Sequence, residues 1–181
     1  MAPVWLLGSG DMAVEYSRVL SEIGIDFITI GRSKKSGFQY SQRTGFKTYT
    51  GGLPKFLKTK PVLPKFAIIA VSIESLSSVC ETLIELGVEN ILLEKPGVGE
   101  INEIDSLIRK SRLSKSNILL AYNRRFYSSV KYAKNQIVRD GGVFSGQIPI
   151  SSAREQIWRV RTTSVPVKLR GASSLLTNGS M

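Results

Sequence analysis

The chain of 181 residues contains no histidine and a single cysteine, Cys80. Histidine is the side chain most often used as a general acid or base near neutral pH, so its absence limits which part of an enzyme this chain can be. One cysteine cannot form an internal disulfide, which suits a reducing cytoplasm. The helical pattern around Cys80 predicts a small core residue, and no metal site is predicted.

Long apolar runs are also missing from the sequence. A membrane-spanning helix needs about 18 or more consecutive apolar residues, and no such run occurs. The apolar residues 4–7 near the amino terminus follow no basic segment, so they predict a first strand rather than a signal peptide. We therefore expect a cytoplasmic protein that does not bind a membrane.

Acidic residues are scarcer than basic ones, and the net charge is +11. A basic nucleic-acid-binding protein is one interpretation of such a charge. The positive residues are scattered, however, with only a small concentration at Arg32, Lys34 and Lys35, and no basic run alternates with aromatic residues. Nucleic acid is therefore not predicted as a partner.

Strand and helix patterns alternate regularly along the first 140 residues. Strands are predicted at residues 3–7, 26–30, 48–50, 66–71, 90–93 and 117–122, and helices at residues 12–23, 39–44, 54–58, 73–86, 100–113 and 128–139. The helix at 100–113 is expected to carry Ile101, Ile104, Leu107 and Ile108 on one apolar face. This alternation predicts an α/β fold with a doubly wound, mostly parallel sheet covered by helices on both faces.

The periodic pattern ends near residue 145. We therefore predict a domain at residues 1–145 and an irregular tail at residues 146–181. One more strand is expected at residues 143–150, and disorder is expected from residue 171. The tail is interpreted as the remnant of a truncated or frame-shifted second domain.

A glycine-rich segment at residues 8–13, GSGDMA, separates the first strand from the first helix. Here Gly8 permits a tight turn, Gly10 lets the backbone approach a pyrophosphate, and Ala13 allows close packing of the helix on the strand. The start of the helix offers free N–H groups and a partial positive charge to phosphates. A dinucleotide site is therefore predicted, with Asp11 either facing solvent or capping the helix.

The end of the second strand indicates which dinucleotide is bound. NAD-binding domains usually carry an acidic residue there, which bonds the ribose 2′-hydroxyl, but residues 30–35 read IGRSKK and contain none. Arg32 can form a bidentate pair with a 2′-phosphate, and Ser33 adds a hydroxyl. NADP is therefore predicted in preference to NAD, while Lys34 and Lys35 belong either to this site or to a solvated loop.

Lys95 is the candidate catalytic residue. It follows a buried strand, and Pro96 restricts the backbone so that Lys95 stays at the lip of the cleft. There a lysine can bond the nicotinamide ribose or a substrate hydroxyl and assist proton movement during hydride transfer. The preceding residue, Glu94, is interpreted as positional rather than as an acid or base.

The predicted cofactor-binding residues lie at the ends of five strands. They are Gly8, Ser9, Gly10, Asp11, Met12, Ala13, Gly31, Arg32, Ser33, Val71, Ser72, Glu94, Lys95, Asn123 and Arg124. Because parallel strands end at one edge of a sheet, these residues are expected to face a single cleft.

Three segments in order, GSGDMA, then EKP at residues 94–96 and AYNRRF at residues 121–126, resemble the glucose–fructose oxidoreductase / inositol dehydrogenase / MocA (Gfo/Idh/MocA) family. The resemblance covers residues 3–145. It implies a Rossmann domain for NAD(P), followed in the family by a second α/β domain that binds substrate and often forms a dimer. It also implies redox chemistry on sugars, cyclitols or nucleotide-sugars, with Lys95 contacting both cofactor and substrate.

The family's second domain usually supplies a D-x-x-x-H pair with histidine as the acid–base group, which this chain lacks. The chain is therefore expected to be the cofactor half, with the substrate half lost and any homo-oligomer weakened. Two hypotheses remain: an NADP-dependent oxidoreductase domain acting on a sugar-like substrate, and a non-catalytic NADP-binding module that acts through a partner chain.

Overall fold

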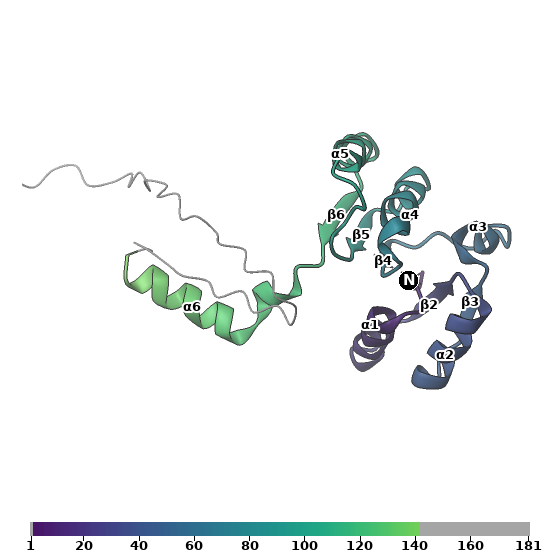
Figure 1. The fold of residues 1–181 in the computed structure, drawn as a ribbon, viewed down its shortest axis with the longest axis horizontal. Coiled ribbons are helices and arrows are strands. Elements are labelled where there is room, and N and C mark those ends of the chain that lie inside the picture. Colours follow the sequence, from purple (N-terminus) through teal and green to yellow (C-terminus); the bar gives the residue numbers. More distant parts are fainter. Residues whose placement is uncertain (1, 142–181) are drawn as a thin grey trace, which may run out of the picture. The chain divides into compact units, whose positions relative to one another are not determined.

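The computed structural model describes residues 2–141 of the chain (Figure 1). The chain divides into two units, residues 1–131 and 132–181. The predicted strand at 143–150, the domain boundary at residue 145 and the expected disorder from residue 171 all lie outside the described residues. Within residues 2–141, no helix is both long enough and apolar enough to cross a membrane.

Strands and helices alternate along the described chain, as the sequence predicts. The strands are β1 (Val4–Leu7), β2 (Phe27–Gly31), β3 (Thr48–Thr50), β4 (Phe66–Ile69), β5 (Asn90–Leu93) and β6 (Asn117–Leu120). The helices are α1 (Asp11–Glu22), α2 (Lys34–Thr44), α3 (Gly52–Leu57), α4 (Ile73–Glu85), α5 (Glu103–Ser114) and α6 (Ser128–Arg139), with a 3-10 helix, η1, at Asn123–Phe126.

All six strands form one sheet in the order β3-β2-β1-β4-β5-β6, and every neighbouring pair is parallel. The chain runs outward from β1 to β3 and then returns to place β4 beside β1. This is the doubly wound arrangement, in which a ligand binds beyond the carboxyl ends of the strands where the order reverses. The predicted fold class is confirmed.

Helices lie on both faces of the sheet (Figure 1), and alternate side chains of the central strand β1 pack in two different clusters. Trp5 and Leu7 pack in a cluster with residues of α3, α4 and α5, and the Trp5 ring meets the edge of Phe56 in α3 at 5.1 Å between centroids. Leu6 packs on the other side with residues of α1 and α2. Cys80 is fully buried in the first cluster, as predicted, and burial raises the pKa of its thiol to about 12.

Two predicted helices begin several residues away from the expected position, whereas α1 and α3 begin within two residues of it. The helix predicted from residue 39 begins at Lys34, because the Ser33 hydroxyl accepts the Ser36 N–H at 3.0 Å and caps it. The helix predicted from residue 100 begins at Glu103, whose carboxylate accepts the N–H groups of Gly99 (2.9 Å) and Glu100 (3.0 Å) and holds them in a turn.

The apolar face predicted for α5 is correspondingly wrong in part. Ile101 precedes the helix and is 85% exposed, and both Ile104 and Ile108 are also exposed. Only Leu107 is buried in the core. The turn that Glu103 stabilises accounts for Ile101, which it leaves outside the helix. Ile104 and Ile108 lie within α5 and are exposed all the same.

Candidate functional site

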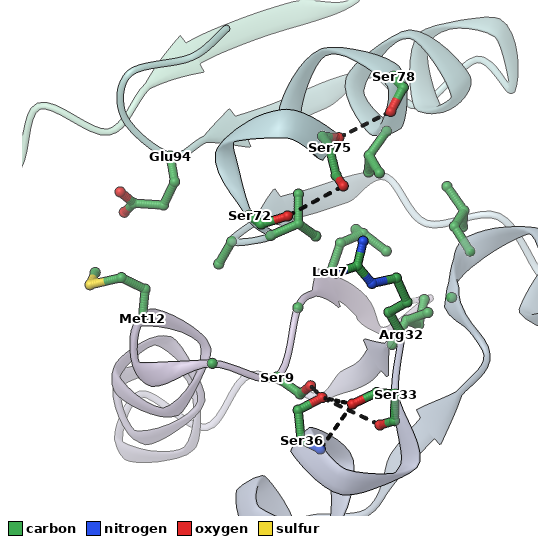
Figure 2. Close-up of a pocket in the computed structure, with 18 of the residues that line it drawn as sticks. Leu7, Ser9, Met12, Arg32, Ser33, Ser36, Ser72, Ser75, Ser78 and Glu94 are labelled. Carbon is green, nitrogen blue, oxygen red and sulfur yellow. Dashed lines mark hydrogen bonds between the residues drawn. The ribbon is translucent and has the colours of Figure 1, made fainter. Parts of the chain in front are cut away.

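A cleft of about 770 Å³ opens beyond the carboxyl ends of β1, β2, β4 and β5 (Figure 2). It lies beside β1 and β4, where the strand order reverses and a doubly wound sheet binds its ligand. Most of the residues predicted from the sequence line this cleft: Gly8, Ser9, Gly10, Asp11, Met12, Arg32, Ser33, Val71, Ser72, Glu94 and Lys95.

The four other predicted residues do not line the main cleft. Ala13 is fully buried and packs α1 against the sheet. Gly31 ends β2 beside the glycine loop, and a Cβ atom there would lie 2.7 Å from the Ser9 hydroxyl. Asn123 and Arg124 instead border a separate hollow of about 320 Å³, which Lys95 also lines. Lys95 therefore belongs to both spaces.

The glycine loop fits a pyrophosphate. Gly8 has a φ of +124°, and a side chain there would overlap the Ala70 carbonyl. Gly10 precedes α1 with an extended backbone, no side chain caps this helix, and a Cβ atom at Gly10 would have no heavy atom within 4 Å. The start of α1 thus has no capping side chain, and the space beside Gly10 is open, which is the arrangement that binds phosphate at a helix start.

Asp11, the first residue of α1, keeps its carboxylate away from this loop. The side chain is 88% exposed and pairs with Arg43 of α2 at 2.6 Å. The expectation that Asp11 faces solvent is therefore correct, and the arginine offsets a charge that would otherwise repel a phosphate.

Beyond β2, one cation and three hydroxyl groups converge. Figure 2 shows the Arg32 side chain directed into the cleft, with Ser9, Ser33 and Ser36 grouped below it. The Ser9 hydroxyl donates to the Ser36 hydroxyl at 2.9 Å, and the Ser33 and Ser36 hydroxyls are 2.8 Å apart. Sequence reasoning missed Ser36; the available signal was Ser33, a favoured helix-capping residue, whose hydroxyl bonds the N–H three residues on, that of Ser36.

Glu74, in the first turn of α4, is a second residue that the sequence did not reveal. Hydrogen bonds from its own backbone N–H and from the Ser72 hydroxyl lower the pKa of Glu74, and the nearby charge of Arg32 lowers it further. The charges of Arg32 and Glu74 thus interact, although no ion pair joins the two side chains among the described residues. No sequence signal links these residues, since they belong to different βα units.

Glu94 lies at the opposite end of the cleft from Arg32 (Figure 2), and Lys95, which follows it after β5, also lines the cleft. Glu94 is only 8% exposed; its carboxylate accepts a hydrogen bond from the Tyr16 hydroxyl of α1 and another from the Lys95 N–H at 3.1 Å. Burial, together with the bond to Glu94 and the charge of Glu94, raises the pKa of Tyr16, while a contact with the Asn123 side chain acts in the opposite direction. The Lys95 side chain is exposed, and the Lys95–Pro96 peptide is cis.

No protein-family model matches the sequence, and no curated protein matches it. The fold is nevertheless similar to solved oxidoreductases. An oxidoreductase from Agrobacterium radiobacter, in complex with NAD+, L-tartaric acid and magnesium, superimposes with a TM-score of 0.67 at 16% identity over 77% of this chain and 40% of its own. The WlbA dehydrogenase from Chromobacterium violaceum, in complex with NADH and UDP-GlcNAcA, gives 0.67 at 14% identity, again over 77% and 40%.

The described residues therefore form a Rossmann fold of the kind found in NAD(P)-dependent oxidoreductases. A Gfo/Idh/MocA family oxidoreductase from Vibrio cholerae has this same fold, with a TM-score of 0.63 at 16% identity over 77% of this chain and 44% of its own. At the level of the fold, this supports the family resemblance that the three sequence segments carry. The chain spans about 40% of the length of the solved structures it matches.

Proposed function

We propose that the cleft binds NADP, and that the chain is the cofactor-binding part of an oxidoreductase acting on a sugar, cyclitol or nucleotide-sugar. The observation that carries the choice of NADP is the group at the end of β2. Arg32 and the hydroxyls of Ser9, Ser33 and Ser36 line the cleft there, and residues 30–35 include no carboxylate. A guanidinium beside several hydroxyls suits a phosphate better than a neutral ribose hydroxyl.

The other parts of the cleft suit the other parts of a dinucleotide. The start of α1 and the open side of Gly10 would hold the pyrophosphate. With the 2′-phosphate at Arg32, the nicotinamide would lie toward Glu94 at the far end (Figure 2). Lys95, the next residue in the chain, lines the cleft as well. The proposal thus assigns each end of the molecule to a different strand end.

Bound NADP supplies hydride chemistry, and this chain's own contribution would be to place a substrate oxygen near Lys95. The exposed lysine ammonium can donate a hydrogen bond or a proton to that oxygen. Support for a sugar-like substrate comes from the sequence resemblance and from the UDP-GlcNAcA bound by the WlbA dehydrogenase.

The cofactor proposal is tested by calorimetric titration of the chain with NADPH and NADH at one fixed ionic strength. We expect tighter binding of NADPH, and we expect Arg32→Asp to weaken it about 10- to 100-fold with little effect on NADH, because a repulsive charge replaces the phosphate partner. Arg109→Asp makes the same change in net charge on α5, away from the cleft, and should alter either affinity less than about twofold. Equal affinities for the two dinucleotides would overturn the preference for NADP.

The catalytic proposal is tested with Lys95→Ala and a panel of sugars and nucleotide-sugars. We expect turnover of NADPH to fall by about 10²- to 10⁴-fold, the usual effect of losing an acid–base group. NADPH affinity should fall no more than about tenfold, because at most one hydrogen bond to the cofactor is lost. Lys47→Ala, exposed and outside the cleft, is the control. Binding of NADPH without turnover of any substrate would instead favour a non-catalytic module.

A further inference from the structure

The carboxylate of Glu94 is buried although no cation neutralises it. It is 8% exposed, and among residues 2–141 no lysine or arginine forms an ion pair with it. A buried carboxylate is costly unless hydrogen bonds satisfy its oxygens. Here one oxygen accepts the Tyr16 hydroxyl and the other accepts the Lys95 N–H.

These two bonds connect three residues from two elements, α1 and the end of β5. Tyr16 lies on α1, the helix whose start forms the proposed pyrophosphate site, while Glu94 and Lys95 follow β5. The bond from Tyr16 fixes the orientation of the carboxylate, and the carboxylate in turn fixes the backbone of Lys95 at 3.1 Å. Since the Lys95 side chain itself is exposed, this backbone bond adds to the restraint that Pro96 places on Lys95 at the lip.

We propose that Tyr16 is a positioning residue, which acts through Glu94 to hold Lys95 at the nicotinamide end of the cleft. This inference rests on the proposed function, because it assumes that Lys95 faces the nicotinamide half of NADP. It assigns to Tyr16 a role in binding that half of the cofactor, although Tyr16 is not among the residues that line the cleft.

A purely structural role for Tyr16 makes a different prediction. If the bond only stabilises the fold, its removal should weaken ligand binding at both ends of the cleft or at neither. Tyr40 offers a matched control, since it is a fully buried tyrosine on α2 whose hydroxyl bonds to Thr29 at 2.9 Å. Tyr40→Phe therefore removes a comparable buried hydrogen bond without touching Glu94.

The experiment compares two probes on the full chain: NADPH, which spans the whole cleft, and 2′,5′-ADP, which reaches only the Arg32 end. We expect Tyr16→Phe to lower the affinity for NADPH about three- to tenfold, the effect of one lost hydrogen bond, and to change the affinity for 2′,5′-ADP by less than about twofold. Tyr40→Phe should not change the ratio of the two affinities. In a Lys95→Ala background, Tyr16→Phe should have no further effect on that ratio, because residues that act through one another are not additive.

Each outcome decides the question. If neither probe binds the unaltered chain, the proposed function fails and the role of Tyr16 fails with it. If 2′,5′-ADP binds but Tyr16→Phe leaves the ratio unchanged, or changes it equally with and without Lys95, only the positioning role is overturned. Should Tyr16→Phe not fold, hydrogen exchange on the unaltered chain replaces it: the Lys95 amide should exchange more slowly than an unprotected peptide, and an unprotected rate would overturn the proposal.

Discussion

Replacing Gly8 with alanine should lower the free energy of unfolding by about 3 kcal/mol or more, which is enough to unfold many domains. Two costs combine at this position. The φ of +124° is strained for any residue with a Cβ atom, and that atom would overlap the Ala70 carbonyl beyond β4. Because Ala70 belongs to the strand end beside β1, relief requires the two central strands to move apart. Urea denaturation with linear extrapolation measures the loss.

The control is Gly24→Ala. Gly24 also has a positive φ, of +69°, but a Cβ atom there meets nothing within 4 Å. Its substitution should therefore cost only the backbone strain, about 1 kcal/mol. If the two variants lose equal amounts of unfolding free energy, the close approach of Gly8 to Ala70 adds nothing to the cost of the Gly8 substitution.

Replacing Gly10 with valine should leave the fold intact but weaken NADPH binding by at least about 100-fold, or roughly 3 kcal/mol. The backbone at Gly10 has a φ of −91°, which valine adopts readily, and no neighbour lies within 4 Å of the new Cβ atom. The free energy of unfolding should therefore change by less than about 1 kcal/mol. The added side chain would instead occupy the space over the start of α1 that the pyrophosphate needs. Calorimetric titration and urea denaturation of one preparation separate the two effects.

Gly10→Ala provides an intermediate case, since one methyl group fills less of that space. The affinity of Gly10→Ala for NADPH should lie between those of the unaltered chain and of Gly10→Val. Unaltered NADPH affinity in Gly10→Val would mean that the dinucleotide does not cross the glycine loop, and the proposed site would be wrong.

The fold was largely predictable from the sequence because each strand carries its own signal. A buried parallel strand is an apolar run that ends at a glycine or a polar residue, as residues 4–7 end at Gly8 and residues 66–71 end at Ser72. Glycines then limit several of the helices. The start of α5 was not predictable, because it depends on the Glu103 side chain folding back onto Gly99 and Glu100. Such side-chain turns leave the helical period of a sequence unchanged.

The candidate site likewise contains residues that the sequence could predict and residues that it could not. Residues directly after a strand, such as Arg32 and Lys95, could be placed because topology brings all parallel strand ends to one edge. Tyr16 and Glu74 could not, since the hydrogen bond of Tyr16 to Glu94 and the charge interaction of Glu74 with Arg32 link residues from different βα units. Whether the assembled residues bind NADP stays a prediction, which the titrations above test.

The pairing of β1 with β4 also has a kinetic consequence. Leu7 is in register with Ile69. Pairing these two strands closes a long loop that contains β2 and β3, and such non-local pairing is slow. The glycine loop and Arg32 belong to the first three strands, whereas Ser72, Glu94 and Lys95 belong to the last three. The cleft therefore exists only after both halves have met, and a dinucleotide would bind only molecules that have completed this step. Bound dinucleotide would therefore slow unfolding rather than accelerate folding.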